Sequence, residues 1–162
     1  MRGAQAGHAS DVEALFRAYW RPSLRAAYLV VHDASAAEDI AQEAFLAAIR
    51  RLHLFDRRRP FGPWLHRIVV NRAIDWTRSR QLRAETGLVD ARTWDDERDV
   101  SDDTLEALAR LTPEHRAVIV LRHLLGYSPG EIAELLDLPR GTVNSRLRRG
   151  LDTLKETVLR ET

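Results

Sequence analysis

The segment from Tyr127 to Arg149 constrains the fold more than any other part of the chain. Ser128 and Glu131 have the spacing of a helix capping box, with Pro129 in the first turn of the helix that they begin. A short run of apolar residues follows, and the chain then breaks at residues 137–139, Asp-Leu-Pro. A longer amphipathic segment comes next. A short helix, a tight turn and a longer helix together predict a helix-turn-helix.

The second of these helices has one apolar stripe, formed by Val143, Leu147, Leu151, Leu154 and Val158. The rest of its first half carries side chains that bind base edges or phosphates, which are Arg140, Thr142, Asn144, Ser145, Arg146, Arg148 and Arg149. We expect Asn144, Ser145, Arg148 and Arg149 to read bases in a major groove. Phosphate contacts are expected from Arg140 and Arg146. An amphipathic helix with a merely solvated basic face is the alternative.

The N-terminal part also has the periodicity of helices, and no convincing strand pattern occurs. Asp11 is expected to cap a first helix. Pro22 is expected either to end this helix or to begin a second one. Asp33 or Ser35 is expected to cap a third helix, reaching about residue 52. A polar loop follows over residues 55–63, and then a helix over about residues 63–79. The expected fold class is all-α.

Charge divides the chain into three parts. Residues 1–80 hold 13 Lys/Arg and 8 Asp/Glu, residues 81–106 hold 3 and 9, and residues 107–162 hold 9 and 7. Basic segments attract the phosphates of nucleic acid, and an acidic segment is repelled by them. We therefore expect two small helical domains, at residues 10–80 and 105–160, joined by a flexible linker at 81–104.

Several functional classes are not supported. The chain has no cysteine, and its six histidines form no metal-binding or catalytic motif. Neither a catalytic residue nor a metal or cofactor is expected. No apolar run approaches the roughly 20 residues that a membrane-spanning helix needs, and no signal peptide is visible at the start. These features predict a cytoplasmic protein that is not an enzyme.

Three motifs, in this order, resemble those of one family. Residues 39–45, Asp-Ile-Ala-Gln-Glu-Ala-Phe, resemble a core-polymerase docking helix, and residues 61–80 resemble a promoter-opening segment. Residues 131–133, Glu-Ile-Ala, and 141–147, Gly-Thr-Val-Asn-Ser-Arg-Leu, resemble a minus-thirty-five-reading helix-turn-helix. The chain thus resembles the extracytoplasmic-function (ECF) sigma factors of the sigma-70 family over residues 10–80 and 105–158. That resemblance implies sigma-two and sigma-four domains.

The resemblance also implies partners. Docking to core RNA polymerase, at the clamp coiled coil of its largest subunit, is expected from Asp39, Ile40, Gln42, Glu43 and Phe45. The flap region of the polymerase, promoter DNA and an anti-sigma factor are the other expected partners. A polar, partly acidic helix face suits a basic coiled coil.

Promoter opening needs unstacked bases to be held and backbone charge to be neutralised. The residues expected to act on the minus-ten element are Phe55, Arg57, Arg58, Arg59, Phe61, Arg67, Asn71, Arg72, Arg78 and Arg80. Trp64 is expected to be structural. The alternative function is that of a conventional helix-turn-helix regulator, which would leave the patterns at 39–45 and 61–80 unexplained.

Overall fold

Helix caps define most of the elements in the computed structural model, which describes residues 1–84 and 100–161. Asp33 begins α3 (Ala34–Arg50), because its Oδ1 accepts a hydrogen bond from the Ala36 amide at 2.9 Å. Thr112 caps α6 (Pro113–Ile119) in the same way. At α7 (Pro129–Leu136) both bonds of the Ser128–Glu131 capping box are formed, at 3.2 and 2.7 Å. Of the two candidates for the α3 cap, Asp33 is the one that forms it, and the predicted capping box at residues 128 and 131 is confirmed.

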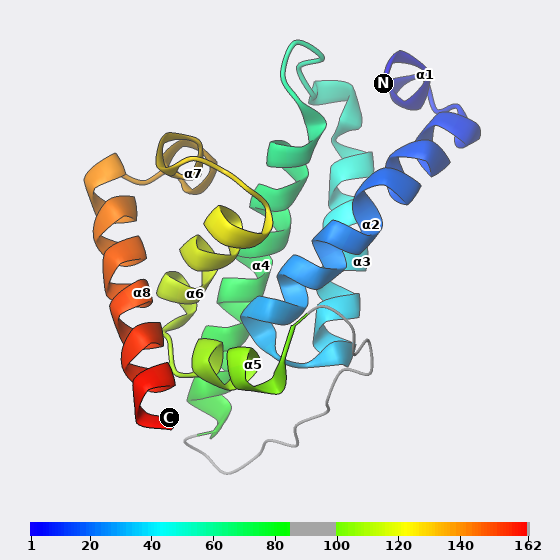
Figure 1. Ribbon diagram of the computed structural model, residues 1–162. Coiled ribbons are helices and arrows are strands. Elements are labelled where there is room, and N and C mark those ends of the chain that lie inside the picture. The colour runs from blue at the N-terminus through cyan, green and yellow to red at the C-terminus, as the bar shows by residue number, and fades with distance from the viewer. Residues whose placement is uncertain (85–99, 162) are drawn as a thin grey trace.

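The remaining elements are also helical, and the described residues contain no strand. In chain order they are α1 (Arg2–Gln5), α2 (Ala9–Val31), the 3₁₀ helix η1 (Leu52–Leu54), α4 (Phe61–Ala84), α5 (Asp102–Ala109), the π-helical turn η2 (Val120–Leu124) and α8 (Arg140–Glu161). Figure 1 shows their arrangement. The predicted all-α class is confirmed.

The first helix differs from the prediction. Pro22 neither ends it nor starts another: α2 runs without a break from Ala9 to Val31, and Asp11 lies in its first turn instead of capping it. Proline lacks the amide that would bond to the preceding turn, which disfavours it inside a helix. Here that cost is offset by packing, since seven residues between Ser23 and Val31 are buried against α3 and α4.

The helices on either side of the predicted linker extend into its predicted bounds. Residues 81–84 belong to α4, and α5 begins at Asp102 after a Ser101 cap, so both ends of the predicted 81–104 linker are helical. The start of α4 also lies earlier than predicted, at Phe61. Residues 85–99, which make up most of the predicted linker, lie outside the described residues.

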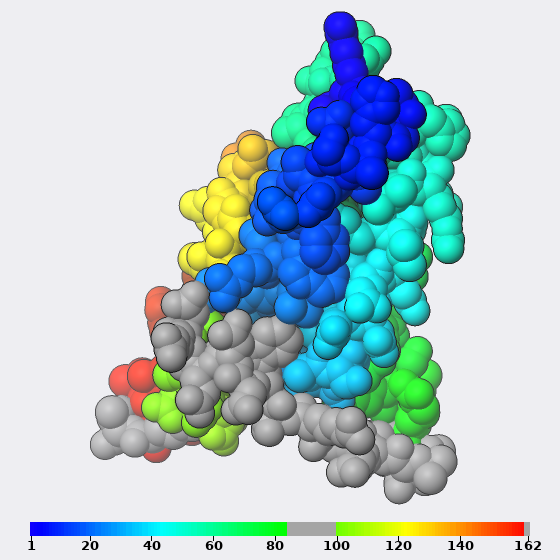
Figure 2. Space-filling view, turned by 90° about the vertical axis from the view of Figure 1, so that its right-hand side faces the viewer, coloured from blue at the N-terminus to red at the C-terminus, as the bar shows by residue number. Residues whose placement is uncertain are grey.

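The N-terminal core is a packed group of three helices. α2 and α3 lie side by side, as Figure 2 shows in blue and cyan, and α4 packs against both. Leu65, Val69, Val70 and Ala73 on the inner face of α4 are completely buried. Burial of such aliphatic side chains is the main source of stability in a small helical domain.

The C-terminal core continues from the first without a gap. α6 packs against α8 on one side and against α4 and α2 on the other, as Figure 1 shows. Val118 and Leu121 are fully buried, and they belong to the same hydrophobic cluster as the core of α4. The two halves of the chain therefore form one body in this structure.

Candidate nucleic-acid and partner interfaces

The helix-turn-helix is formed by α7, a tight turn and α8. Its inner face is apolar: Ile132 and Val143 are fully buried, and Leu147 is nearly so. Asp137 ends α7 in the left-handed region, at φ 54° and ψ 51°, a conformation that aspartate tolerates better than most residues. The single left-handed residue reverses the chain and allows α8 to begin at Arg140.

The predicted reading residues lie on the outer side of α8. Arg140, Asn144, Arg148 and Arg149 are exposed, and the partly exposed ones are Thr142, Ser145 and Arg146. The apolar stripe stays packed while these side chains face outward. This arrangement is compatible with insertion of α8 into a major groove.

Gly150 has a structural role that its sequence position did not reveal. A Cβ at this position would lie 3.0 Å from Cγ1 of Ile119, so the absence of a side chain lets α8 pack tightly against α6. This close packing offsets the cost of glycine in a helix, which is about 1 kcal/mol.

On α3, the five expected docking residues divide into two groups. Asp39, Gln42 and Glu43 are exposed, whereas Ile40 and Phe45 are buried in the core. The two buried side chains therefore hold α3 in place and do not reach its outer surface. Asp39, Gln42 and Glu43 form a polar, partly acidic face along the helix.

This face continues into an apolar patch that sequence reasoning missed. Leu46 is 51% exposed, Ile49 is 40% exposed, and Phe16 of α2 beside them is 41% exposed. The signal was available, because three successive apolar residues, 44–46, cannot all point into the core from one helix. We refer to Phe16, Leu46 and Ile49 as the apolar patch.

A groove of about 600 Å³ adjoins the apolar patch. It lies between the N-terminal segment and the end of α3, and its lining includes Gln5, Phe16, Ile49 and Leu52. The polar face of α3 thus ends beside a hollow that α1 helps to enclose.

The loop before α4, residues 55–60, is anchored by aromatic rings. Phe55 and Phe61 are buried and pack edge to face with centroids 5.7 Å apart, and Trp64 lies 5.0 Å from Phe55. In this structure the two phenyl rings face the core and do not present a surface for a base. Trp64 packs in the same cluster, in accordance with its expected structural role.

The three arginines of this loop, by contrast, are all exposed. Asp56 shapes the tip, because Oδ1 accepts from the backbone amide and from Nε of Arg58 at 3.0 Å each, and Oδ2 accepts from Nη2 at 3.1 Å. These hydrogen bonds from Arg58 lower the pKa of Asp56. The loop therefore presents a compact cluster of positive charge, which we call the arginine loop (residues 55–60).

The outer side of α4 carries Arg67 and Asn71, both exposed. The other predicted DNA contacts on this helix are paired within the protein. Arg72 donates to Glu43 at 2.9 Å, so one ion pair joins the α3 docking face to α4. Arg80 lies 3.4 Å from Asp33 and over the ring of Trp76.

Arg78 is paired across the two halves of the chain. Its Nε donates to Oε1 of Glu114 in α6 at 2.7 Å, and Nη2 donates to the same oxygen. Burial raises the pKa of Glu114, but the hydrogen bonds from Arg78 and from the backbone, together with the positive charges of Arg78 and Arg146, hold this pKa below its usual value. Arg78, which was predicted to contact DNA, is thus paired with a residue of the C-terminal half in this structure.

A second contact between the halves joins His66 and Tyr127. Nδ1 of His66 and the Tyr127 hydroxyl lie 2.7 Å apart. Burial lowers the pKa of His66 to about 4 and raises that of Tyr127 to about 12, so both side chains are neutral at pH 7.

Arg116 forms the most buried of these contacts. Its side chain is 5% exposed and donates to carbonyls at the end of α5, namely Leu108 at 2.8 Å, Leu111 at 2.9 Å and Ala109 at 3.1 Å. It also donates to the carbonyl of Val30, near the end of α2. Carbonyls near two helix C-termini, where the helix dipole is negative, thus hold one buried cation.

Among the described residues, no group of histidines and carboxylates has the geometry to bind a metal ion. None of the helices over residues 1–84 and 100–161 is both long and apolar enough to cross a bilayer.

Family comparisons identify both halves. The model of sigma-70 region 2 matches residues 15–83, and that of sigma-70 region 4 matches residues 101–154. The ECF RNA polymerase sigma factor SigL of Mycobacterium tuberculosis is 35% identical over 96% of this chain and 93% of its own length. SigW of Bacillus subtilis, another ECF sigma factor, is 32% identical over 80% of this chain and 79% of its own.

Solved structures share the fold along the whole chain. CnrH, in complex with the cytosolic domain of CnrY, has a TM-score of 0.78 at 26% identity, covering 99% of this chain and 96% of its own. The sigma factor RpoE of Bartonella quintana, solved with the anti-sigma factor NepR, has a TM-score of 0.77 at 20% identity, covering 93% and 98%. The joint packing of the two halves is therefore shared with these folds.

Proposed function

This chain belongs to the ECF sigma factors of the sigma-70 family, and we propose that its three outward-facing surfaces dock core RNA polymerase and read two promoter elements. It is an alternative-sigma-type transcription initiation factor and not an enzyme. The alternative of a conventional helix-turn-helix regulator is not favoured, because such a regulator has no need of a region 2 domain.

One observation carries the proposal. A single chain combines a helix-turn-helix with an exposed outer face, a second helix that exposes Arg67 and Asn71, and a third helix with an exposed, partly acidic face. A sigma factor needs these three surfaces together.

Docking to the polymerase is assigned to the face of Asp39, Gln42 and Glu43, extended by the apolar patch. A basic coiled coil of the clamp would meet carboxylates at one end and apolar side chains at the other. The mixture favours a specific interface, since charge steers the encounter and burial of apolar area slows dissociation. Ile40 and Phe45 are buried in the core and hold α3 in the position that exposes this face.

Minus-ten binding is assigned to the arginine loop, Arg67 and Asn71. The loop arginines neutralise phosphates as the strands separate, and the Asn71 amide is suited to a base edge or a phosphate. Phe55 and Phe61 hold the loop in place through the aromatic cluster. Minus-thirty-five binding is assigned to the outer face of α8, with base contacts from Asn144, Ser145, Arg148 and Arg149.

Promoter binding also requires the two halves to separate. The two elements lie about 25 base pairs apart, which is roughly 85 Å at 3.4 Å per base pair, whereas a compact chain of this length has a radius of gyration of only about 15 Å. The contacts of Arg78, His66 and Arg116 across the halves therefore belong to a closed state, and we propose that it opens in the holoenzyme. An anti-sigma factor that binds this closed state would retain it, in the cytoplasm where the polymerase works.

The test is transcription with purified core polymerase on a random promoter library. The full chain should select templates with two conserved elements at a fixed spacing, and core polymerase alone should not. Selection of a single palindromic site, without any effect on initiation by core polymerase, would instead support a conventional regulator.

A further inference from the structure

We propose that Gln5, in the N-terminal helix α1, is a positioning residue for the arginine loop and so for promoter opening. The inference rests on the proposed function, since it concerns how the loop reaches DNA. It adds a residue outside both regions that the family models match, which begin at residue 15.

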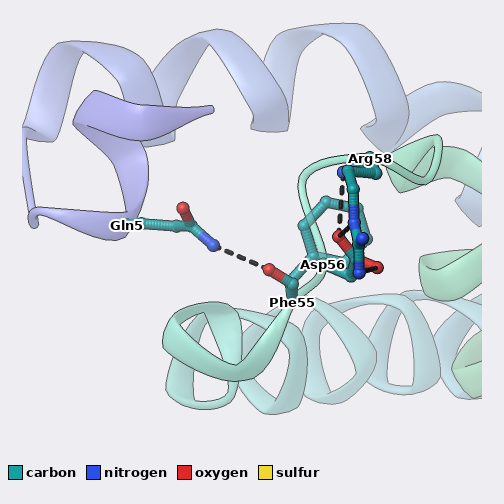
Figure 3. A network of polar contacts seen from close by, with 4 residues as sticks. All are labelled: Gln5, Phe55, Asp56 and Arg58. Carbon is teal, nitrogen blue, oxygen red and sulfur yellow. Dashed lines mark hydrogen bonds and ion pairs between the residues drawn. The ribbon is translucent and has the colours of Figure 1, made fainter.

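The amide of Gln5 holds the base of the loop at two points. Its Nε2 donates to the carbonyl of Leu52 and to the carbonyl of Phe55, each at 2.9 Å. These acceptors lie at the two ends of η1, where the chain leaves α3 and enters the loop. Figure 3 shows the bond to Phe55 and, at the next residue, the pair of Asp56 with Arg58.

The primary amide of Gln5 suits both acceptors. One NH₂ group carries two hydrogens in a fixed plane, and here each hydrogen has its own carbonyl. The Leu52 carbonyl also accepts the Phe55 amide at 3.1 Å, which closes η1. Gln5 therefore fixes the single turn that sets the direction of the loop.

The fold of the N-terminal segment places the Gln5 side chain at the base of the loop. α1 has four residues, too few to be stable as an isolated helix, so its position depends on tertiary contacts. Gly7 turns the chain with φ 82°, and Ala4 is buried. A Cβ at Gly3 would lie 1.7 Å from Oδ2 of Asp11, so this carboxylate packs closely against α1 where α1 folds back on α2.

Beyond Phe55 the loop is held by its own contacts. The ring of Phe55 is buried in the aromatic cluster, and Asp56 folds the tip through Arg58 and through its carbonyl, which accepts the Arg59 amide at 3.0 Å. A displacement at Phe55 would therefore move the whole cluster of positive charge. A loop displaced in this way would lose conformational entropy when it became ordered on DNA. The two hydrogen bonds of Gln5 avoid this cost because they order the loop beforehand.

The variants are Gln5→Met, which keeps the length of the side chain and removes both donors, and Gln5→Glu, which places a carboxylate against two carbonyls. Arg2→Ala is the matched control, since Arg2 is an exposed residue of the same short helix. The protein is assayed as holoenzyme with core polymerase, on a promoter selected by the wild-type chain. Open-complex formation is followed on duplex DNA and on a template that is already melted at the minus-ten element.

Gln5→Met should slow opening of duplex DNA about two- to ten-fold, the range of one or two neutral hydrogen bonds, and Gln5→Glu at least as much. The pre-melted template should recover most of the loss, and core affinity should be unchanged. Trypsin should cleave both Gln5 variants faster at the bonds after residues 57–58, because a released loop exposes them more often. Arg2→Ala should match the wild type in every assay.

Wild-type opening rates and wild-type trypsin rates in both Gln5 variants would overturn the inference. An equal loss of core affinity and of activity on both templates would also overturn it, because Gln5 would then serve the stability of the domain and not the position of the loop. Failure of the proposed function looks different, since the wild-type chain itself would then give no initiation with core polymerase.

Discussion

The guanidinium of Arg116 donates a hydrogen bond to the main-chain carbonyl of Val30, a residue 86 positions earlier in the chain. The same guanidinium donates to three carbonyls at the end of α5, and burial lowers its pKa to about 10. It remains charged at neutral pH. One cation from the region 4 half therefore ties together the ends of two helices, one of which belongs to the region 2 half.

Replacement of Arg116 should release the closed state. In Arg116→Met four carbonyls lose their hydrogen bonds from the guanidinium, while the apolar part of the side chain is kept. We expect the free energy of unfolding to fall by about 2–4 kcal/mol. Urea denaturation followed by circular dichroism gives the stability, and small-angle scattering gives the radius of gyration. An unchanged radius together with unchanged stability would show that Arg116 does not hold the halves together.

Acid should loosen the same interface through His66. The pKa of His66 is about 4 in the folded chain against 6.5 in the unfolded one, so the unfolded state takes up the proton first as the pH falls. Stability is therefore full above about pH 6.5 and declines from there toward pH 4, by up to about 1.4 kcal/mol per pH unit. His32 has a pKa of about 4 as well, lowered by burial and by Arg116, and adds to the decline.

His66→Gln should flatten this pH dependence, and His123→Gln, at an exposed position, should leave it unchanged. Thermal unfolding between pH 4 and pH 7.5 makes the comparison. A slope in His66→Gln as steep as that of the wild type would assign the acid sensitivity to other groups.

Reversal of charge on α3 should weaken holoenzyme assembly. Asp39→Arg places a cation where a basic coiled coil is proposed to dock, and we expect at least a ten-fold loss of core affinity, or about 1.4 kcal/mol. Leu46→Asp tests the apolar patch in the same assay, and Asp103→Arg on α5 is an exposed control. If all three variants bind core polymerase as tightly as the wild type does, the docking surface lies elsewhere.

The arginine loop should matter more for opening than for binding. Replacement of Arg57, Arg58 and Arg59 by alanine should reduce open-complex formation on duplex promoters, with partial recovery on a pre-melted template. The triple change also removes the Arg58 partner of Asp56, so Arg57→Ala alone is a useful companion. An equal defect on both templates would mean that the loop provides only general DNA affinity.

The outer face of α8 should divide into base-reading and phosphate-binding residues. Arg149→Ala is expected to relax preference at one or two base pairs, at a cost of about 1–3 kcal/mol. Arg146→Ala is expected to weaken binding to all sequences and to lower the salt slope by roughly one unit. A promoter library transcribed with each variant compares them, and the opposite pattern would mean that the reading face is assigned wrongly.

Local sequence determined the helices wherever caps and periodicity agree. Asp33 and Ser128 start their helices in the structure as their spacing predicts, because a cap depends on residues within one turn. The helix-turn-helix and the outward placement of Asn144 and Arg148 follow from the same short-range rules. The family motifs at residues 39–45 and 131–147 identified both domains for the same reason, since they lie on contiguous stretches of chain.

Tertiary structure decided the features that depend on residues far apart in the sequence. Pro22 lies inside an unbroken helix because burial of the residues after it outweighs one missing hydrogen bond. Phe55 and Phe61 turn inward because a shared aromatic cluster buries them, although their neighbours suggested a DNA-facing loop. The bonds of Arg116 to Val30, His66 to Tyr127 and Gln5 to Phe55 join residues 50 to 86 positions apart. No periodicity or cap encodes such pairs, because they form only after separate helices have packed together.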